Sequence, residues 1–345
     1  MSIVNGGPAL TRDAEAWNGH LACLNGHLLQ SWQWGAFKSR YGWRAERVVY
    51  PEIGEPRAMA QVLFQFRGPV SVGYIPRGPA FAAGDGDAVS ALFEAIDRVA
   101  RRNRALYLVV EPNSQLPLDG TFKDNGFVRG PDHFQPERTV QIPLLEDEAL
   151  LKQMHQKTRY SVRLAQRRGV VLETDQQGHE AAREFYELLR DTSERNQFGI
   201  HPESYYADFL DILGENATLL LARYEGFMAA GVIAARFGRE AIYMYGGSSS
   251  EHRAHGAAFM LQFEAMRWAR GAGSQIYDLW GIPSQDPEST GLEGGRVAGS
   301  KGDDWRGLYK FKVGFGGDIV RYPPAIERRY HPFLAAAARR VVRRD

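Results

Sequence analysis

The chain has 345 residues, of which 44% are apolar, and its formal net charge is +1. This length allows two domains with large cores, and the near-neutral charge gives no global preference for nucleic acid or anionic membranes. The single cysteine, Cys23, excludes an internal disulfide and fits a reducing compartment. No His/Cys spacing indicates a metal site. Residues 1–29 lack the apolar core of a signal peptide, so we expect a cytoplasmic protein.

Two stretches of the chain are alike at an offset of about 170 positions, which indicates an internal duplication. Each consists of an apolar hairpin, a helix and a strand, bounded by Gly and Pro. The three parts lie at 59–79, 89–102 and 106–112 in the first copy and at 229–248, 256–270 and 275–283 in the second. The sequence therefore predicts an α+β fold with two copies of one domain. We place these domains at residues 1–148 and 149–345, with a return of residues 318–345 to the first domain as an alternative.

A basic segment, residues 150–168, opens the second domain. It contains six Lys and Arg residues and no acidic residue. Arg159, Arg163 and Arg167 recur every four positions and so share one face of a helix, which Gly169 ends. A structural or solvated face and a contact with a phosphate-bearing partner explain this stripe about equally well. The Ala-rich tail, residues 330–345, predicts a helix whose terminal arginines suit its C-terminus, with contact to an anionic membrane surface as the lesser alternative.

Apolar and polar residues alternate in the run 308–317, which predicts a half-buried strand. On a strand, Lys310 and Lys312 would point to the same face. Such a pair could hold phosphates or stabilise an oxyanion during acyl transfer, although solvated lysines on an amphipathic strand are the simpler explanation.

The sequence Arg253-x-x-Gly256-x-Ala258 follows a predicted strand and opens a helix. It fits the phosphate-binding pattern of GNAT acyltransferases, in which small residues expose backbone N–H groups at a helix N-terminus. Residues 294–301 resemble a P-loop only faintly, because Ser300 stands where the lysine is required. Metalloprotease, GxSxG and kinase motifs are absent from the sequence. An acyl donor should therefore arrive already activated.

Taken together, these segments resemble the FemABX family of peptidoglycan aminoacyltransferases. The resemblance covers residues 29–38, 73–79, 157–163, 192–201, 205–206 and 308–317. It implies two tandem GNAT-like domains, without the helical-hairpin insertion of some members. It further implies transfer of Gly, Ala or Ser, with a weak preference for Gly, from aminoacyl-tRNA to an amine of the peptidoglycan stem peptide. The acceptor would be lipid II or UDP-MurNAc-pentapeptide, and no cofactor would be needed.

The resemblance also assigns residues. Lys38 would contact acceptor phosphates, and Lys312, with Lys310 as a less certain neighbour, would stabilise the carbonyl oxyanion of the transferred group. Tyr205 and one of two other tyrosines, Tyr243 and Tyr245, would line the acceptor site. His201 would be a further substrate-binding residue, at a position where the family often has a basic residue. A neutral imidazole holds phosphate less well than a guanidinium, so a phosphate-binding role for His201 stays open. The remaining candidates are Trp34, Tyr74 and Arg77 for the substrate, and Arg159, Arg163, Arg167, Arg253, Gly256 and Ala258 for the donor. For Arg77, between Pro76 and Gly78, bracing of a turn is an equally good explanation.

Glu111, at a predicted strand end before Pro112, is the candidate general base, although a structural role competes with it. Asp278 occupies the corresponding place in the second copy, where pairing in the core is the expected role. Two other functions stay open: an N-acyltransferase that uses acyl-CoA, and a non-catalytic module that binds lipid II or tRNA. The sequence does not indicate an oligomeric state.

Overall fold

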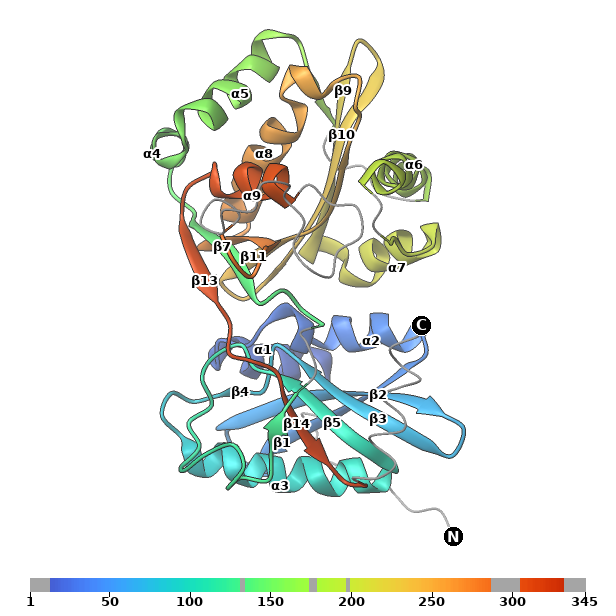
Figure 1. The fold of residues 1–345 in the computed structure, drawn as a ribbon, viewed down its shortest axis with the longest axis vertical. Coiled ribbons are helices and arrows are strands. Elements are labelled where there is room, and N and C mark those ends of the chain that lie inside the picture. Colours follow the sequence, from blue (N-terminus) through green and yellow to red (C-terminus); the bar gives the residue numbers. More distant parts are fainter. Residues whose placement is uncertain (1–12, 131–133, 174–178, 197–198, 287–304, 332–345) are drawn as a thin grey trace. The chain divides into compact units, whose positions relative to one another are not determined.

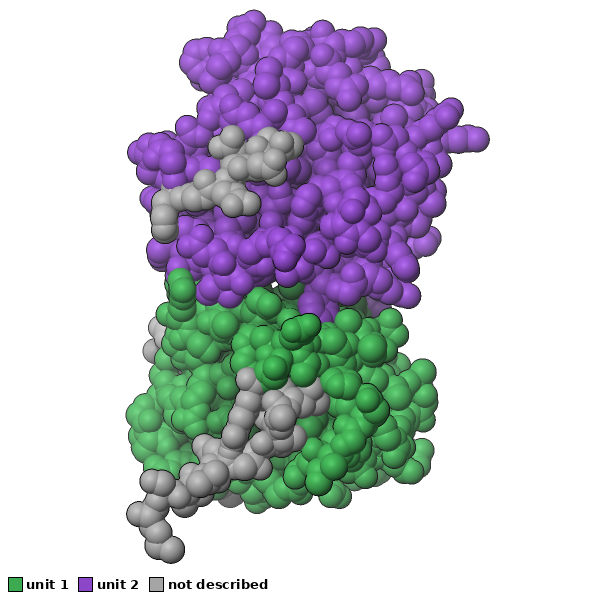
Figure 2. Space-filling view, turned by 180° about the vertical axis from the view of Figure 1, so that it is seen from behind, with its two compact units in different colours: residues 1–135, 322–345 green, residues 136–321 purple. Residues whose placement is uncertain are grey.

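The computed structural model describes residues 13–130, 134–173, 179–196, 199–286 and 305–331 (Figure 1). The chain forms two compact units, one of residues 1–135 and 322–345 and the other of residues 136–321 (Figure 2). The glycine-rich loop at 294–301 and nearly all of the helix expected at 330–345 lie outside the described residues.

The first unit is built on a sheet with the strand order β1-β2-β3-β5-β14-β6, in which β4 pairs with β2. In Figure 1 the helix α3 lies along one side of this sheet, and α1 and α2 lie on the other. The elements are α1 (Ala14–Cys23), η2 (Leu28–Gln30), α2 (Trp32–Arg40), β1 (Trp43–Tyr50), β2 (Ala58–Arg67), β3 (Val70–Pro76), β4 (Ala80–Phe81), α3 (Gly86–Arg102), β5 (Ala105–Glu111), β6 (Val128–Arg129) and β14 (Ile326–Arg329).

The second unit has the strand order β13-β7-β12-β11-β10-β9-β8. Helices α4, α5, α8 and α9 lie on one side of this sheet and α6 and α7 on the other (Figure 1). The elements are β7 (Arg138–Pro143), α4 (Asp147–Gln153), α5 (Gln156–Arg167), β8 (Val171–Glu173), α6 (His179–Asn196), α7 (Glu203–Leu213), η3 (Gly214–Asn216), β9 (Ala217–Tyr224), β10 (Phe227–Phe237), β11 (Glu240–Ser248), η4 (Arg253–His255), α8 (Ala257–Gly271), β12 (Ile276–Ile282), α9 (Trp305–Val313) and β13 (Asp318–Arg321).

The predicted duplication is confirmed by the strand topology. In the first unit the antiparallel hairpin β2–β3 is followed by α3 and by β5, which returns parallel to β3. In the second unit the hairpin β10–β11 is followed by α8 and by β12, parallel to β11. Each copy is completed by an antiparallel strand from elsewhere in the chain, β14 beside β5 and β7 beside β12.

The chain divides between residues 135 and 136, whereas the sequence suggested a division after residue 148. The cause is β7, which pairs with both β12 and β13 of the second unit. Directly after β13 the chain returns to the first unit as β14, which pairs with β5 and β6.

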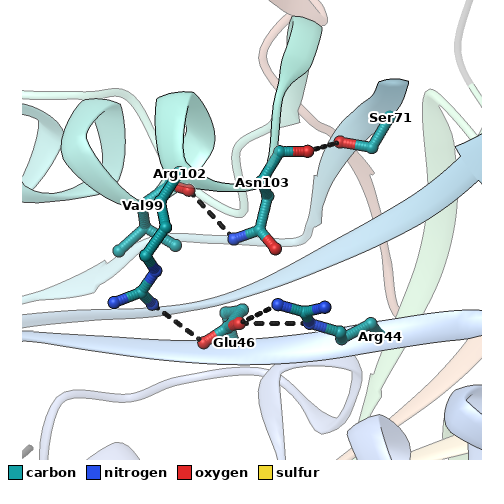
Figure 3. A network of polar contacts seen from close by, with 6 residues as sticks. All are labelled: Arg44, Glu46, Ser71, Val99, Arg102 and Asn103. Carbon is teal, nitrogen blue, oxygen red and sulfur yellow. Dashed lines mark hydrogen bonds and ion pairs between the residues drawn. The ribbon is translucent and has the colours of Figure 1, made fainter. Parts of the chain in front are cut away.

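The helix of the first copy is held over its sheet by polar contacts at its C-terminal end (Figure 3). The Ser71 hydroxyl on β3 donates to the carbonyl of Asn103, 2.7 Å away. Arg102 pairs with Glu46 on β1 at 3.4 Å. On its buried side α3 presents apolar residues at helical spacing, among them Val89, Leu92 and Ile96.

The prediction of a strand at 308–317 is wrong. Residues 305–313 form the helix α9, and the glycines that follow have positive φ at Gly316 and Gly317. Side chains two positions apart on a helix point in different directions, so Lys310 is exposed whereas Lys312 is buried, with 5% of its surface exposed. Phe311 and Phe315, four positions apart, both pack on Phe259 of α8, at ring distances of 4.9 and 5.9 Å. This contact with α8 favours a helical conformation of residues 305–313 rather than the extended conformation of a strand.

Candidate functional site

The two parallel strands at the centre of the second unit separate at their C-terminal ends. The ladder between β11 and β12 runs from Glu240↔Ile276 to Ile242↔Asp278, whereas β11 continues to Ser248 and β12 to Ile282. In the first unit the equivalent strands stay paired up to Pro76↔Glu111. Beyond Ile242 and Asp278 the two parallel strands of the second copy are therefore no longer joined by a ladder, and the place between them is called the opening.

A buried carboxylate shapes β12 where it leaves the ladder. Asp278 is 0% exposed and accepts hydrogen bonds from the Thr139 hydroxyl, from the backbone N–H of Trp280 at 2.6 Å and from the Gln141 amide at 3.2 Å. Trp280 takes a left-handed φ of 60°, and the register against β7 shifts between Asp278 and Gly281. This turn presents the carbonyl of Gly281 to the opening.

Lys312 fills the opening from α9. Its Nζ donates to the carbonyl of Gly281 at 2.8 Å and lies 5.5 Å from the ring centroid of Tyr243 on β11. Burial lowers the pKa of Lys312 to about 7, and the nearby Asp278 charge partly opposes this shift. This pKa lies near neutrality, so both the ammonium and the neutral amine form of Lys312 are accessible at physiological pH.

A β-bulge gives the two candidate tyrosines of β11 different partners. The pairing with β10 shifts between Ile233↔Tyr245 and Ala234↔Tyr243. Tyr243 consequently packs with the core on the α8 side and with Lys312, and burial raises its pKa to about 12. Tyr245 instead packs against α7, with ring distances of 6.3 Å to Tyr205 and 5.6 Å to Phe209.

His201 belongs to this second aromatic group. Its ring stacks on Tyr205 at 3.8 Å with an interplanar angle of 17°. Tyr205 is 3% exposed, so it lies beneath the histidine ring. The structure thus brings together His201, Tyr205 and Tyr245, and separately Tyr243 and Lys312.

In the first unit, Lys38 lies near aromatic rings at the end of α2. Its Nζ is 5.8 Å from the ring centroid of Trp34 and 6.0 Å from that of Phe37. Burial lowers the pKa of Lys38. A neighbouring anion would favour its charged form, and binding of acceptor phosphate by Lys38 stays a prediction.

Glu111 forms the centre of a polar cluster at the end of β5. Its carboxylate is 1% exposed and accepts from the Tyr74 hydroxyl, from the N–H of Phe134 at 2.7 Å and from that of Gln135 at 3.1 Å. Burial and, secondarily, the Glu111 charge hold the pKa of Tyr74 well above its ordinary value. These contacts give Glu111 a structural task, and its role as a general base stays a prediction.

Arg77 is the buried side chain of the turn that follows β3. It is 1% exposed and has a left-handed φ of 49°. Its guanidinium stacks 3.5 Å above the ring centroid of Tyr322, in the segment that returns to the first unit. The geometry therefore gives Arg77 a bracing role, while substrate binding by Arg77 stays a prediction.

The predicted donor loop is explained by packing. Gly256 precedes α8 with φ 79°, and a Cβ placed there would lie 2.4 Å from the carbonyl oxygen of Ser161 on α5. Arg253 is exposed, and Ala258 lies in the first turn of α8. The close approach of α5 accounts for this glycine without an anion.

The basic residues of α5 have separate surroundings. Arg159 donates to the carbonyls of Leu151 at 3.3 Å and Met154 at 3.2 Å, and so closes the end of α4. Arg163 and Arg167 are exposed, and Arg167 lies 5.4 Å from the ring centroid of Tyr160. A shallow groove of about 490 Å³ is lined by Gln156, Lys157, Arg159, Tyr160, Arg163 and Arg167.

Sequence reasoning missed the anchoring network of Asp278. Its partners Thr139 and Gln141 lie on β7, far away in sequence, and no motif joins them. Within the described residues, no group of three or more His, Cys, Asp or Glu is arranged to hold a metal ion. Of the helices that the structure describes, none has the length and apolar character needed to cross a membrane.

Comparison with known proteins gives one consistent result. The model of the FemAB family matches residues 17–225 and 224–343. A lipid II:glycine glycyltransferase of Staphylococcus aureus is 26% identical, over 78% of this chain and 83% of its own, and one of Staphylococcus haemolyticus is 25% identical with the same coverage. The crystal structure of FemX matches with a TM-score of 0.81 at 22% identity, covering 94% of this chain and 98% of that one.

A more distant structural neighbour, L-PGS from Bacillus licheniformis, has a TM-score of 0.58 at 15% identity and covers 98% of each chain. At these identities the structures establish the fold, which consists of two GNAT-like domains as expected. The family match spans nearly the whole chain, including both units. The chain belongs to the FemAB family.

Proposed function

We propose that this protein transfers an aminoacyl group from aminoacyl-tRNA to an amine of the peptidoglycan stem peptide. The observation that carries the proposal is Lys312, buried in the opening between β11 and β12 of a FemAB-family fold. The similarity to lipid II:glycine glycyltransferases supports a cell-wall acceptor and favours glycine as the transferred residue. Lipid II and UDP-MurNAc-pentapeptide are the candidate acceptors.

In the proposed reaction the acceptor amine attacks the carbonyl carbon of the aminoacyl ester. An amide bond forms, the ester C–O bond breaks, and the ribose hydroxyl of the tRNA leaves with the proton that the amine loses. The ester is already activated, so the reaction requires no ATP. The carbonyl oxygen becomes an oxyanion during attack, and Lys312 would donate to it in place of Gly281.

The lowered pKa of Lys312 is compatible with this role, because the protonated form is still accessible near neutral pH. A protonated Lys312 stabilises the oxyanion, and its burial strengthens that interaction relative to water. In the first unit, Lys38 would bind an acceptor phosphate beside Trp34. Glu111 is the weaker candidate for a general base, because it already accepts from Tyr74 and two backbone amides.

An acyl-CoA donor is the less favoured alternative. The GNAT-like pattern places its phosphate contacts at the start of α8, where the backbone of Ser161 closely approaches Gly256. An RNA donor could instead use the exposed arginines of α5, Arg163 and Arg167.

The test is a transfer assay with radiolabelled glycyl-, alanyl- and seryl-tRNA against lipid II and UDP-MurNAc-pentapeptide, with acetyl-CoA as the rival donor. Label should move from one of the tRNAs to the stem peptide. Lys312→Met should lower kcat by about 100-fold or more, as loss of an oxyanion donor does, while Lys310→Met removes an exposed lysine of the same helix as a matched control. Transfer from acetyl-CoA alone would refute the proposal.

A further inference from the structure

A group of aromatic rings, one of them exposed and three partly buried, lies at one end of the second unit, outside the residues discussed above. It consists of Tyr224 and Phe227 at the β9–β10 turn, and His252 and His255 at η4, and is called the aromatic surface below. Tyr224 and His255 stack at 3.7 Å with an interplanar angle of 15°. Phe227 lies nearly parallel to His252 at 5.7 Å and is 65% exposed.

The aromatic surface is continuous with the basic side of α5. Arg168, directly after α5, donates to the carbonyl of Ala254 at 3.1 Å and lies 3.3 Å from Nδ1 of His255. The exposed Arg163 and Arg167 precede it on the helix. Positively charged side chains therefore extend from the middle of α5 to the edge of the aromatic surface.

The other end of α5 lies against the helix that carries Lys312. The N–H of His155 donates to the carbonyl of Gly314 at 2.9 Å, and a Cβ at Gly314 would lie 2.3 Å from the Thr158 hydroxyl. Twelve residues of helix span about 18 Å. A few nucleotides cover such a distance, so one extended strand could reach from the Lys312 region to the aromatic surface.

The charges around the rings are mixed, because Arg168 and the exposed Arg253 of η4 lie there together with two carboxylates. Glu225 is hydrogen bonded to the Tyr224 hydroxyl, and Glu251 is an exposed neighbour of His252. These carboxylates repel phosphate but accept hydrogen bonds from base amino groups. Arginines beside exposed ring faces are the combination with which proteins hold single-stranded RNA, in which phosphates meet cations and bases stack on rings.

We propose that the aromatic surface binds an unpaired base of the donor RNA, while the neighbouring phosphates lie along Arg163 and Arg167. This inference rests on the proposed function in that it takes the donor to be an aminoacyl-tRNA. It adds a stacking site that is separate from the acyl-transfer centre at Lys312. Phe227 is the main stacking residue, because it is the most exposed large apolar side chain of the second unit's described residues.

The test uses two labelled, uncharged RNA hairpins, one with an unpaired 3′ end of about four nucleotides and one with a blunt end. Binding is measured by fluorescence anisotropy over a range of salt concentrations. Phe227→Ala should weaken binding of the first hairpin by roughly 5- to 150-fold, the loss expected for one stacked base, without changing the salt dependence. Phe227→Trp keeps an aromatic ring and should bind the first hairpin about as tightly as the wild type. The blunt hairpin should bind equally to the wild type, Phe227→Ala and Phe227→Trp.

Two further variants sharpen the result. The double variant Arg163→Ala, Arg167→Ala should weaken binding of both hairpins and reduce the slope of log K against log salt by about 2. Ile53→Ala, which truncates a 90% exposed apolar side chain of the first unit, is the matched control.

Equal binding of the overhang hairpin to wild type and Phe227→Ala would overturn the stacking site while leaving the proposed function in place. If the wild-type protein binds neither hairpin and transfers no label from aminoacyl-tRNA, the proposed function fails and the inference fails with it.

Discussion

The ionisation of Lys312 can be tested without knowledge of any substrate. Its pKa of about 7 in the folded protein compares with 10.5 for an ordinary lysine. Well below pH 7 both the folded and the unfolded chain carry the ammonium group, and its burial then lowers the free energy of unfolding by the full amount. Between the two pKa values the unfolded chain binds more protons, so the free energy of unfolding rises with pH by up to about 1.4 kcal/mol per unit.

The perturbation is Lys312→Met, which keeps an unbranched side chain and removes the titrating amine. Between about pH 6 and about pH 9, the stability of the wild type relative to this variant should increase by about 3 kcal/mol. Comparing the two proteins cancels the contributions of the other titrating groups.

The assay is urea denaturation of both proteins at the two pH values, followed by tryptophan fluorescence and circular dichroism. Lys310→Met controls for the loss of one positive charge from the same helix. A wild-type-to-variant difference that stays the same at both pH values would refute the reasoning, because it would mean that the amine of Lys312 remains solvated.

Three further predictions each concern one buried residue and its contacts. Asp278→Asn removes the charge that opposes the shift of Lys312, so its pKa should fall further and the pH–rate profile of transfer should move to lower pH; an unchanged profile would contradict this coupling. Gly256→Ala combines a positive φ with a contact to the Ser161 carbonyl and should cost about 1–2 kcal/mol or more in thermal denaturation, whereas Gly19→Ala, with no atom near its Cβ, should not destabilise. Glu111→Gln should lower stability by about 1–3 kcal/mol, because it weakens the acceptor of two backbone amides, and should change kcat of transfer little; a loss of about 100-fold or more in kcat would establish the general base instead.

The duplication could be predicted because both copies carry the same order of apolar hairpin, helix and strand. Those patterns reflect burial in each unit's own core, for example at Val62 and Val232. The stop after α5 at Gly169 was also predictable, since its φ of 77° suits glycine. Local signals of this kind survive into the folded structure.

The surroundings of Lys312 could not be predicted in the same way. The five alternating residues 309–313 fit a strand, and the aromatic pair Phe311 and Phe315 fits a helix equally well. The contact with Phe259, more than forty residues earlier, decides between them. The partners of Asp278 come from β7 in the same non-local manner, as does the packing of α5 on Gly256.

The return of the chain as β14 has a consequence for how the protein is made. Strand β5 ends at Glu111, but its neighbour β14 begins only at Ile326. At about 5–20 residues per second, a ribosome takes about 10–40 seconds to synthesise the intervening segment. During that time the edge of β5 has no partner from β14, while the whole of the second unit emerges. The domain whose synthesis starts first is therefore completed last, and nascent chains stalled before Ile326 should present an open sheet edge to chaperones.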